Sequence, residues 1–389
     1  MKKILPVLLA CLMLWGCGAK EAPAPTAVVT AATEAAETTV ATEPTVAAEP
    51  TVAAEPVETE PIPEHLQLKP LENYNVDAEV FSRGVTSAAP VEMAPLGLTA
   101  EQLLTILMPE DTSQRTAENV EFRRSVTTEQ GSSLTFTDSH FTAFRGGYEH
   151  QDLWEMETLL SGWAEEHPED AVHPLDFMSP EEALQKAKDV LKQMNVGYEP
   201  VVDVFAALTG PEINAYQEVC LDDPMYTEFG KFHMLPELTD AHDAYYLHFS
   251  FAFNGIPLSQ PGVMSNTYGA VFAPDAAMLI TREGIVYFSC LGLQALKSVG
   301  EPQTLITPDE AIEAMGKVVQ DRFYDQEVYR TSRMELGYLP LCAEGKTTLI
   351  PYWGVEVLTS QVPDDLPPQF RPQISNWFNG FTGAYFTDE

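Results

Sequence analysis

Apolar side chains recur at intervals of three and four residues in three parts of the chain. This spacing predicts amphipathic helices that each present one apolar face to a flat apolar surface. The positions concerned are Ala183, Leu184, Ala187, Val190 and Leu191; then Ala311, Ile312, Met315, Val318 and Val319; and, more briefly, Leu103, Leu104 and Leu107.

Each of these helices is preceded by a residue pattern that is typical of a helix start. "SPEE" begins at Ser179 and "TPDE" at Thr307, while "TAEQ" at Thr99 is a weaker version. The hydroxyl group can cap the helix, proline suits the first turn, and Glu or Gln three residues later can bond back to the amide of the cap residue. The acidic residues at these starts are therefore interpreted as caps rather than as paired catalytic carboxylates.

After each long helix the pattern changes to segments rich in aromatic and β-branched residues, which predicts strands. These segments are "AYYLHFSFAFNGIPL" (244–258), "AAMLITREGIVYFSCLG" (276–292), "TTLIPYWGVEVLTS" (347–360) and "SNWFNGFTGAYFTD" (375–388). The order predicts an α+β fold with helices on one face of antiparallel sheets. We expect two helix-on-antiparallel-sheet modules, at residues 175–304 and 305–389, joined by an N-terminal α+β segment at residues 66–174.

The N-terminus has the pattern of an export signal. Lys2 and Lys3 precede an apolar run, residues 4–15, that is too short to cross a hydrocarbon layer of about 30 Å. The tetrapeptide "LWGC" then resembles a bacterial lipobox, although its Trp15 departs from the usual small residue. The resemblance implies a signal peptide at residues 1–16 and a diacylglyceryl anchor on Cys17, which would hold the protein at the extracytoplasmic face of the cell membrane. Cleavage after "LLA", before Cys11, and ordinary secretion are the alternatives.

Residues 17–65 consist mainly of Ala, Thr, Val, Pro and Glu, and "TVAAEP" occurs there twice in succession. Such a composition offers too little large apolar surface to offset the entropy cost of ordering, so we expect a disordered tether that holds the folded part away from the membrane.

Composition and charge restrict the class of partner. Lys and Arg number 21 against 58 Asp and Glu, a net charge of −37, which argues against binding of nucleic acid or of anionic lipid by charge. Beyond Cys11 and Cys17, the cysteines are Cys220, Cys290 and Cys342, which allow at most one disulfide and match no zinc pattern.

No phosphate-binding loop, nucleophile elbow or zinc-protease motif is present in the sequence, so we predict a non-catalytic protein without cofactor or metal. Two histidine-containing stretches, "HPEDAVHP" (167–174) and "DAHDAYYLH" (240–248), could contribute metal ligands, with His242 and His248 on one face of a strand. Solvated acidic loops are the favoured interpretation. An enzyme with scattered catalytic residues is left open.

Aromatic residues are concentrated near the C-terminus. Alternation along strands would place about half of them against a helix and the rest outward, where Tyr and Trp often mark binding surfaces. Packing in the core is the favoured interpretation for the group as a whole. The candidate binding surface consists of Tyr352, Trp353, Trp377, Phe381 and Tyr385.

The last part of the chain resembles a PepSY-type module, in which a capped helix packs on a small antiparallel sheet that ends in a "D-A-x-T-G" hairpin. Thr307, Glu310 and Ala311 match its start, and "NGFTG" (379–383) matches its end, with Asn and Gly in place of Asp and Ala. A proline-rich insert near residues 362–373 is a further departure.

Two short sequence stretches carry a second resemblance. "LGYLP" (336–340) and "LIPYWGVEV" (349–357) resemble uncharacterised lipoproteins of Firmicutes with a layout like the YycH/YycI group of extracytoplasmic regulators. The resemblance implies a regulatory module that binds an envelope protein or a peptide. A lipoprotein that captures a small solute or glycan is the alternative, and it would have a deep pocket lined by aromatic side chains.

Overall fold

The computed structural model describes the chain from residue 61 onward, with gaps. The described residues are 61–110, 113–120, 123–129, 132–137, 142–145, 153–221, 235, 237–259, 273–324, 326–343, 345–362 and 376–386. The expected signal peptide, Cys17 and nearly all of the expected tether lie outside them. None of the helices in these ranges combines the length and the apolar character that crossing a bilayer requires.

The fold is α+β, as the sequence predicts, and its strand pairing is mostly antiparallel. The helices are α1 (Ala100–Leu107), α2 (Leu153–Glu166), α3 (Pro180–Gln193), α4 (Gly210–Leu221), the 3-10 turn η3 (Asp240–His242) and α6 (Pro308–Arg322). The strands are β1 (His65–Leu71), β2 (Tyr74–Phe81), β3 (Ser87–Ala88), β4 (Val91–Pro95), β5 (Arg115–Val120), β6 (Arg123–Thr128), β7 (Ser133–Thr137), β8 (Thr142–Arg145), β9 (Glu199–Leu208), β10 (Ala244–Phe253), β11 (Ile256–Leu258), β12 (Asp275–Thr281), β13 (Gly284–Leu291), β14 (Gln294–Val299), β15 (Gln303–Thr304), β16 (Tyr329–Ala343), β17 (Lys346–Val355), β18 (Leu358–Thr359) and β19 (Asn376–Asn379).

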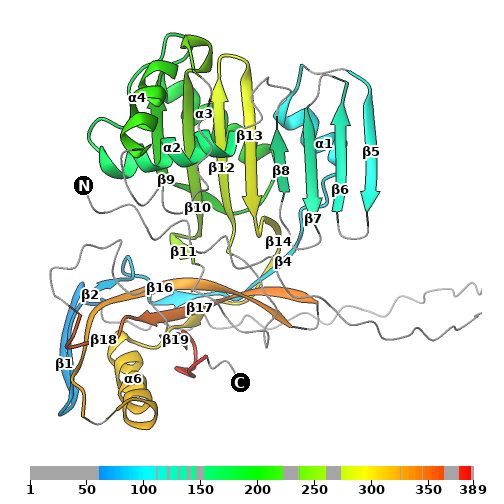
Figure 1. Cartoon of the computed structure of the whole chain (residues 1–389). Helices are drawn as coiled ribbons and strands as arrows, with labels where there is room; N and C mark the ends of the chain where they lie inside the picture. The colour runs from blue at the N-terminus through cyan, green and yellow to red at the C-terminus, as the bar shows by residue number, and fades with distance from the viewer. Residues whose placement is uncertain are drawn as a thin grey trace, which may run out of the picture. The chain divides into compact units, whose positions relative to one another are not determined.

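The first section of the main sheet runs in the order β5-β6-β7-β8-β13-β12-β10-β9, and every neighbouring pair is antiparallel (Figure 1). Helices cover both of its faces. Leu247 and Phe249 of β10 lie in one apolar cluster with α3 and α1, whereas Ala244 and Tyr246 lie in a second cluster with α2 and α4. The expectation of helices on one face is therefore wrong for this section. Strand β10 is buried on both sides and so carries a nearly continuous apolar run.

The second section has β16 and β17 at its centre. β16 pairs in parallel with β2, which pairs with β1, and β17 pairs on its other edge with β19 and β4. β4 in turn pairs with β14. Helix α6 contacts β1, β2, β17 and β19, and its buried side chains lie in one apolar cluster with Trp353, Val355 and Phe378 (Figure 1).

The second section draws strands from both ends of the described chain. β1, β2 and β4 come from the expected N-terminal segment, yet β2 pairs with β16 and β4 pairs with β17, two strands that follow residue 305. The expected boundary between residues 304 and 305 therefore does not delimit a self-contained module, because α6 and β16 need β1 and β2 as neighbours. Pro61–Glu389 forms one compact unit.

Strand β11 joins the two sections. It forms a hairpin with β10 through the turn at Asn254 and Gly255, and it pairs in parallel with β16 at Leu258 and Tyr338. Both turn residues have positive φ angles, 48° and 77°, which are typical of the tight two-residue turns that asparagine and glycine favour. β11 and β2 both pair with β16 in the parallel sense.

The expected helix caps are confirmed. The hydroxyls of Thr99, Ser179 and Thr307 each accept a hydrogen bond from the backbone N–H three residues later, and the Gln or Glu there accepts one from the amide of the cap residue. The apolar faces are confirmed as well, since the expected positions of α1 and α6 are all buried and only Leu184 of the expected α3 face is partly exposed.

Candidate functional site

Three of the five aromatic residues of the expected binding surface are buried. Tyr352 and Trp353 are 0% exposed and Trp377 is 7% exposed. Trp353 lies under α6, where its indole Nε1 donates a hydrogen bond to the carbonyl oxygen of Ile306 at 3.0 Å. Tyr352 and Trp377 lie in a smaller cluster with Leu339. None of these three rings can present an outward binding face.

Phe381 and Tyr385 are partly buried against the main apolar cluster. The ring of Tyr385 is covered by the guanidinium of Arg322 at 5.3 Å, and its hydroxyl donates to Asn376 Oδ1 at 3.2 Å. The expected exposed aromatic stripe is thus corrected: in the second half of β17 and in β19, side chains are buried on both sides of the sheet, so alternation does not separate inward from outward rings there.

A pocket of about 970 Å³ lies where β2 and β11 approach the same strand, β16. Its walls come from four stretches of chain: residues 62–65, 79–84, 255–259 and 333–336. β2 ends opposite Glu335 of β16, and β11 resumes the parallel pairing at Tyr338. The N–H of Ser259 donates to the carbonyl of Tyr338 at 3.1 Å and fixes this end of the wall. We refer to this cavity as the β2–β11 pocket.

Tight turns fix the two strand ends at the pocket. Arg83 and Gly84, which follow β2 after Ser82, have φ angles of 52° and 72°, and the turn before β11 also has positive φ angles. A left-handed conformation is costly for a residue with a Cβ atom, so Arg83 is held there by its surroundings. The N–H of Gly84 donates to Ser82 Oγ at 3.2 Å, which supports the turn.

A chain of contacts runs from the rim of the pocket into the core. The guanidinium of Arg333 lies 5.2 Å from the ring centroid of Phe81, whose side chain is 49% exposed. Nη2 of Arg333 is 3.1 Å from Glu335 Oε2, and Glu335 Oε1 accepts a hydrogen bond from the hydroxyl of buried Tyr352 at 3.3 Å. Burial, together with the charge of Glu335, raises the pKa of Tyr352, so this hydroxyl stays protonated and holds the carboxylate in place.

The pocket was not predicted from the sequence, although one signal was available. In β2 buried and exposed positions alternate strictly, and the exposed ones carry Asn75, Asp77, Glu79 and Phe81. A phenylalanine at the last outward position departs from the polar character of the others. Large outward aromatic side chains are typical of binding surfaces.

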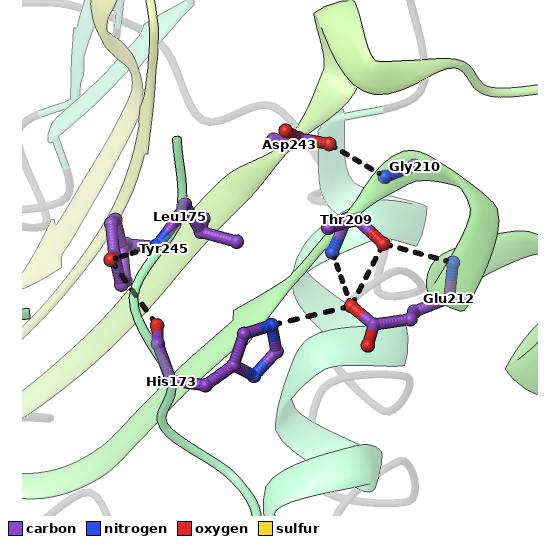
Figure 2. A network of polar contacts seen from close by, with 7 residues as sticks. All are labelled: His173, Leu175, Thr209, Gly210, Glu212, Asp243 and Tyr245. Atoms are coloured by element: carbon purple, nitrogen blue, oxygen red, sulfur yellow. Dashed lines mark hydrogen bonds and ion pairs between the residues drawn. The ribbon is translucent and has the colours of Figure 1, made fainter. Parts of the chain in front are cut away.

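The first histidine-containing stretch takes part in a structural network, which Figure 2 shows. Nε2 of His173 lies 3.4 Å from Glu212 Oε2, and the same oxygen accepts hydrogen bonds from the amide and the hydroxyl of Thr209. Asp243 Oδ1 accepts from the N–H of Gly210 at 3.0 Å. These contacts stabilise the start of α4 against β9 and β10.

The second stretch is divided between two elements. Nδ1 of His242 accepts a hydrogen bond from the amide of Thr239 at 2.9 Å, within the turn η3, whereas His248 lies on β10 beside Asp203. No cluster of His, Cys, Asp and Glu in the described ranges has the geometry of a metal site. No disulfide joins the described cysteines Cys220, Cys290 and Cys342.

Comparisons with known proteins give information about the fold alone. No protein-family model matches the chain. No curated protein matches it either. Among solved structures, the chain is similar to an uncharacterised protein from Eubacterium rectale, with a TM-score of 0.50 and 13% sequence identity over 84% of this chain and 94% of that one. At this identity the likeness concerns the arrangement of elements.

Proposed function

We propose that this protein is a lipid-anchored, extracytoplasmic binding protein that takes up a peptide segment of another envelope protein in the β2–β11 pocket. The proposed anchor is Cys17, supported by the lipobox-like "LWGC" and the basic and apolar residues before it. The proposed activity is non-catalytic and regulatory, supported by the resemblance of the last part of the chain to PepSY-type modules.

The mixed lining of the pocket is the observation that carries the binding proposal. Charges of both signs come from Glu64, Glu79, Arg83, Arg333 and Glu335, while Val80, Ile256, Pro257 and Leu336 add apolar surface. A peptide offers the same mixture, with backbone donors and acceptors and side chains of either charge. A glycan would rest on aromatic faces, and Phe81 is the aromatic side chain among the described lining residues.

We also propose that α6 and the strands around it form a PepSY-like module. The turn after β19 supports this proposal. Asn379 Oδ1 accepts hydrogen bonds from the backbone N–H groups of Phe381 at 2.9 Å and Thr382 at 3.1 Å. An aspartate at the same position, as in the "D-A-x-T-G" hairpin, could accept the same two bonds. The module would include β1 and β2 from the start of the folded part.

The test of the pocket is photo-crosslinking in intact cells. A photoreactive phenylalanine analogue replaces Phe81 in one variant and Tyr324, which is 78% exposed and not part of the pocket lining, in the control variant. We expect a reproducible protein adduct from position 81 that is absent from position 324, and that weakens when Arg333 is also replaced by Gln. Equal labelling from both positions, or no protein adduct from position 81, would contradict peptide binding and favour a small solute, for which the pocket is also large enough.

A further inference from the structure

Glu157 lies on the side of helix α2 that packs against the first section of the sheet. Met156 and Leu160 are buried there, and Glu157 lies between the hydroxyls of two tyrosines. Tyr246 of β10 donates to Glu157 Oε1 at 3.3 Å, and Tyr287 of β13 bonds to the same carboxyl group. The carboxyl group of Glu157 is thus part of the contact between the helix and the sheet.

Further ionisable groups lie beside this contact on the same face. Nδ1 of His248, two residues beyond Tyr246, is 3.4 Å from Asp203 Oδ2 of β9, and Asp203 Oδ1 accepts from Ser250 at 2.8 Å. His248 lies opposite Ala277 of β12, so Asp275 is a diagonal neighbour on that face. Asp275 Oδ1 accepts from the N–H of Leu291 at 3.2 Å.

Three carboxyl groups therefore interact electrostatically with one imidazole, that of His248. The charges that act on His248 are those of Asp275, Asp203 and Glu157, which come from β12, β9 and α2. Crowded carboxylates of like charge at a partly desolvated surface resist full ionisation. His248 and Asp203 have side chains that are 31% and 40% exposed, so protons can exchange with solvent without unfolding of the protein.

We propose that the α2 cluster, consisting of Glu157, Asp203, His248 and Asp275 with Tyr246 and Tyr287, is a pH-sensitive switch that stabilises the packing of α2 on the sheet in mild acid and weakens it as the pH rises. The proposal stands apart from peptide binding, because none of these residues lines the β2–β11 pocket.

The pKa values of Glu157, Asp275 and His248 are shifted in the same direction. Burial raises the pKa of Glu157 and of Asp275. For His248, burial alone would lower the pKa, but the hydrogen bond to Asp203 and the charges of Asp275, Asp203 and Glu157 outweigh it, so the pKa is raised. In each case the folded state binds the proton more tightly than the unfolded state does.

The sign of the pH dependence follows from these directions. The stabilisation from Glu157 and Asp275 is complete below their unfolded pKa values of about 4, and is lost as the pH rises through their higher folded values. The stabilisation from His248 is complete below about pH 6.5 and is lost as the pH rises through its raised folded pKa. The cluster therefore weakens over a window that begins near about pH 4 and extends above about pH 6.5.

The test is hydrogen–deuterium exchange of the α2 amides in the detergent-solubilised full chain, corrected for the intrinsic pH dependence of exchange. We expect their protection to fall between about pH 5 and about pH 8, by about tenfold for each unit by which the pKa of a cluster residue is raised. Glu157→Gln keeps an acceptor for Tyr246 without the charge, so its protection should change much less with pH. Glu166→Gln, which removes an exposed charge from the end of the same helix, should behave like the wild type.

Either of two exchange results would overturn the proposal: wild-type protection that does not depend on pH, or the same pH slope in Glu157→Gln and Glu166→Gln. If Glu157→Gln fails to fold, an NMR titration of the His248 imidazole in the unmodified protein tests the proposal instead. The His248→Gln variant is used to assign the NMR signal of this imidazole. A midpoint above about 6.5 supports the proposal, and a midpoint at or below that value overturns it.

Discussion

Replacement of Trp353 by Phe tests whether this ring belongs to the core or to a binding surface. Trp353 is fully buried between β17 and α6, and its Nε1 donates to the carbonyl of Ile306, just before the cap of that helix. Phenylalanine keeps an aromatic ring at the site but has no N–H and is smaller. The variant should therefore lose one hydrogen bond and leave unfilled space beneath α6.

The expected loss of stability can be worked from these contacts. Loss of the hydrogen bond costs about 1 kcal/mol, and more if the carbonyl of Ile306 finds no other donor. The missing part of the indole ring costs about 2 kcal/mol, at about 0.8 kcal/mol per buried carbon group with some empty space left behind. We expect the free energy of unfolding to fall by about 3 kcal/mol.

Urea unfolding followed by far-UV circular dichroism measures this change, because the substitution itself alters tryptophan fluorescence. The midpoint should fall while the slope stays the same. Tyr324→Ala is the matched control, since this aromatic side chain is 78% exposed and its removal should change stability by less than about 0.5 kcal/mol. A loss below about 1 kcal/mol for Trp353→Phe would refute the core assignment.

Two further predictions concern the cap of α6 and the proposed lipid anchor. Thr307→Ala should lower the free energy of unfolding by about 1 kcal/mol in thermal melts, because the hydroxyl accepts a hydrogen bond from the N–H of Glu310. Thr307→Ser keeps a hydroxyl and should retain most of the wild-type stability. Equal melting curves for the two variants would contradict the capping role. Cys17→Ala should move the protein from the membrane fraction to the soluble fraction, as measured by fractionation and immunoblotting, with Cys11→Ala as the control. Retention of the Cys17 variant in the lipid fraction would rule out this anchor.

The features that the sequence predicts correctly are local ones. A cap and its partner lie three residues apart, and an apolar helix face repeats within one or two turns, so Ser179 with Glu182 and Ala311 with Met315 are visible without knowledge of the fold. The short-range signals therefore specify the α+β class.

The features that the sequence does not predict depend on contacts between distant parts of the chain. The hydroxyls of Tyr74 and Thr331 hydrogen bond at 2.7 Å, and this pair lies where β2 meets β16. No local pattern indicates that partner. The β2–β11 pocket is missed for the same reason, because its walls come from four separate stretches.

The aromatic residues near the C-terminus show what strand periodicity alone does not predict. Alternation along β17 correctly places Tyr352 and Trp353 on opposite faces, but both are buried. Periodicity reports which side chains share a face, and only the complete fold determines what covers that face. The outward position of Phe81 follows from the alternation along β2, but the pocket beside it depends on the pairing of β2 with the distant strand β16.

The parallel pairing of β2 with β16 determines when the second section can fold during synthesis of the chain. Tyr74 and Thr331 are 257 residues apart, so β1 and β2 leave the ribosome long before their partner exists. Contacts of such long range slow folding, and an unpaired strand edge invites wrong pairing in the meantime. We expect the second section to form only after nearly the whole chain has been made. Products that stop before residue 329 would then be recognised as incomplete by proteases, because β2 would lack its neighbour.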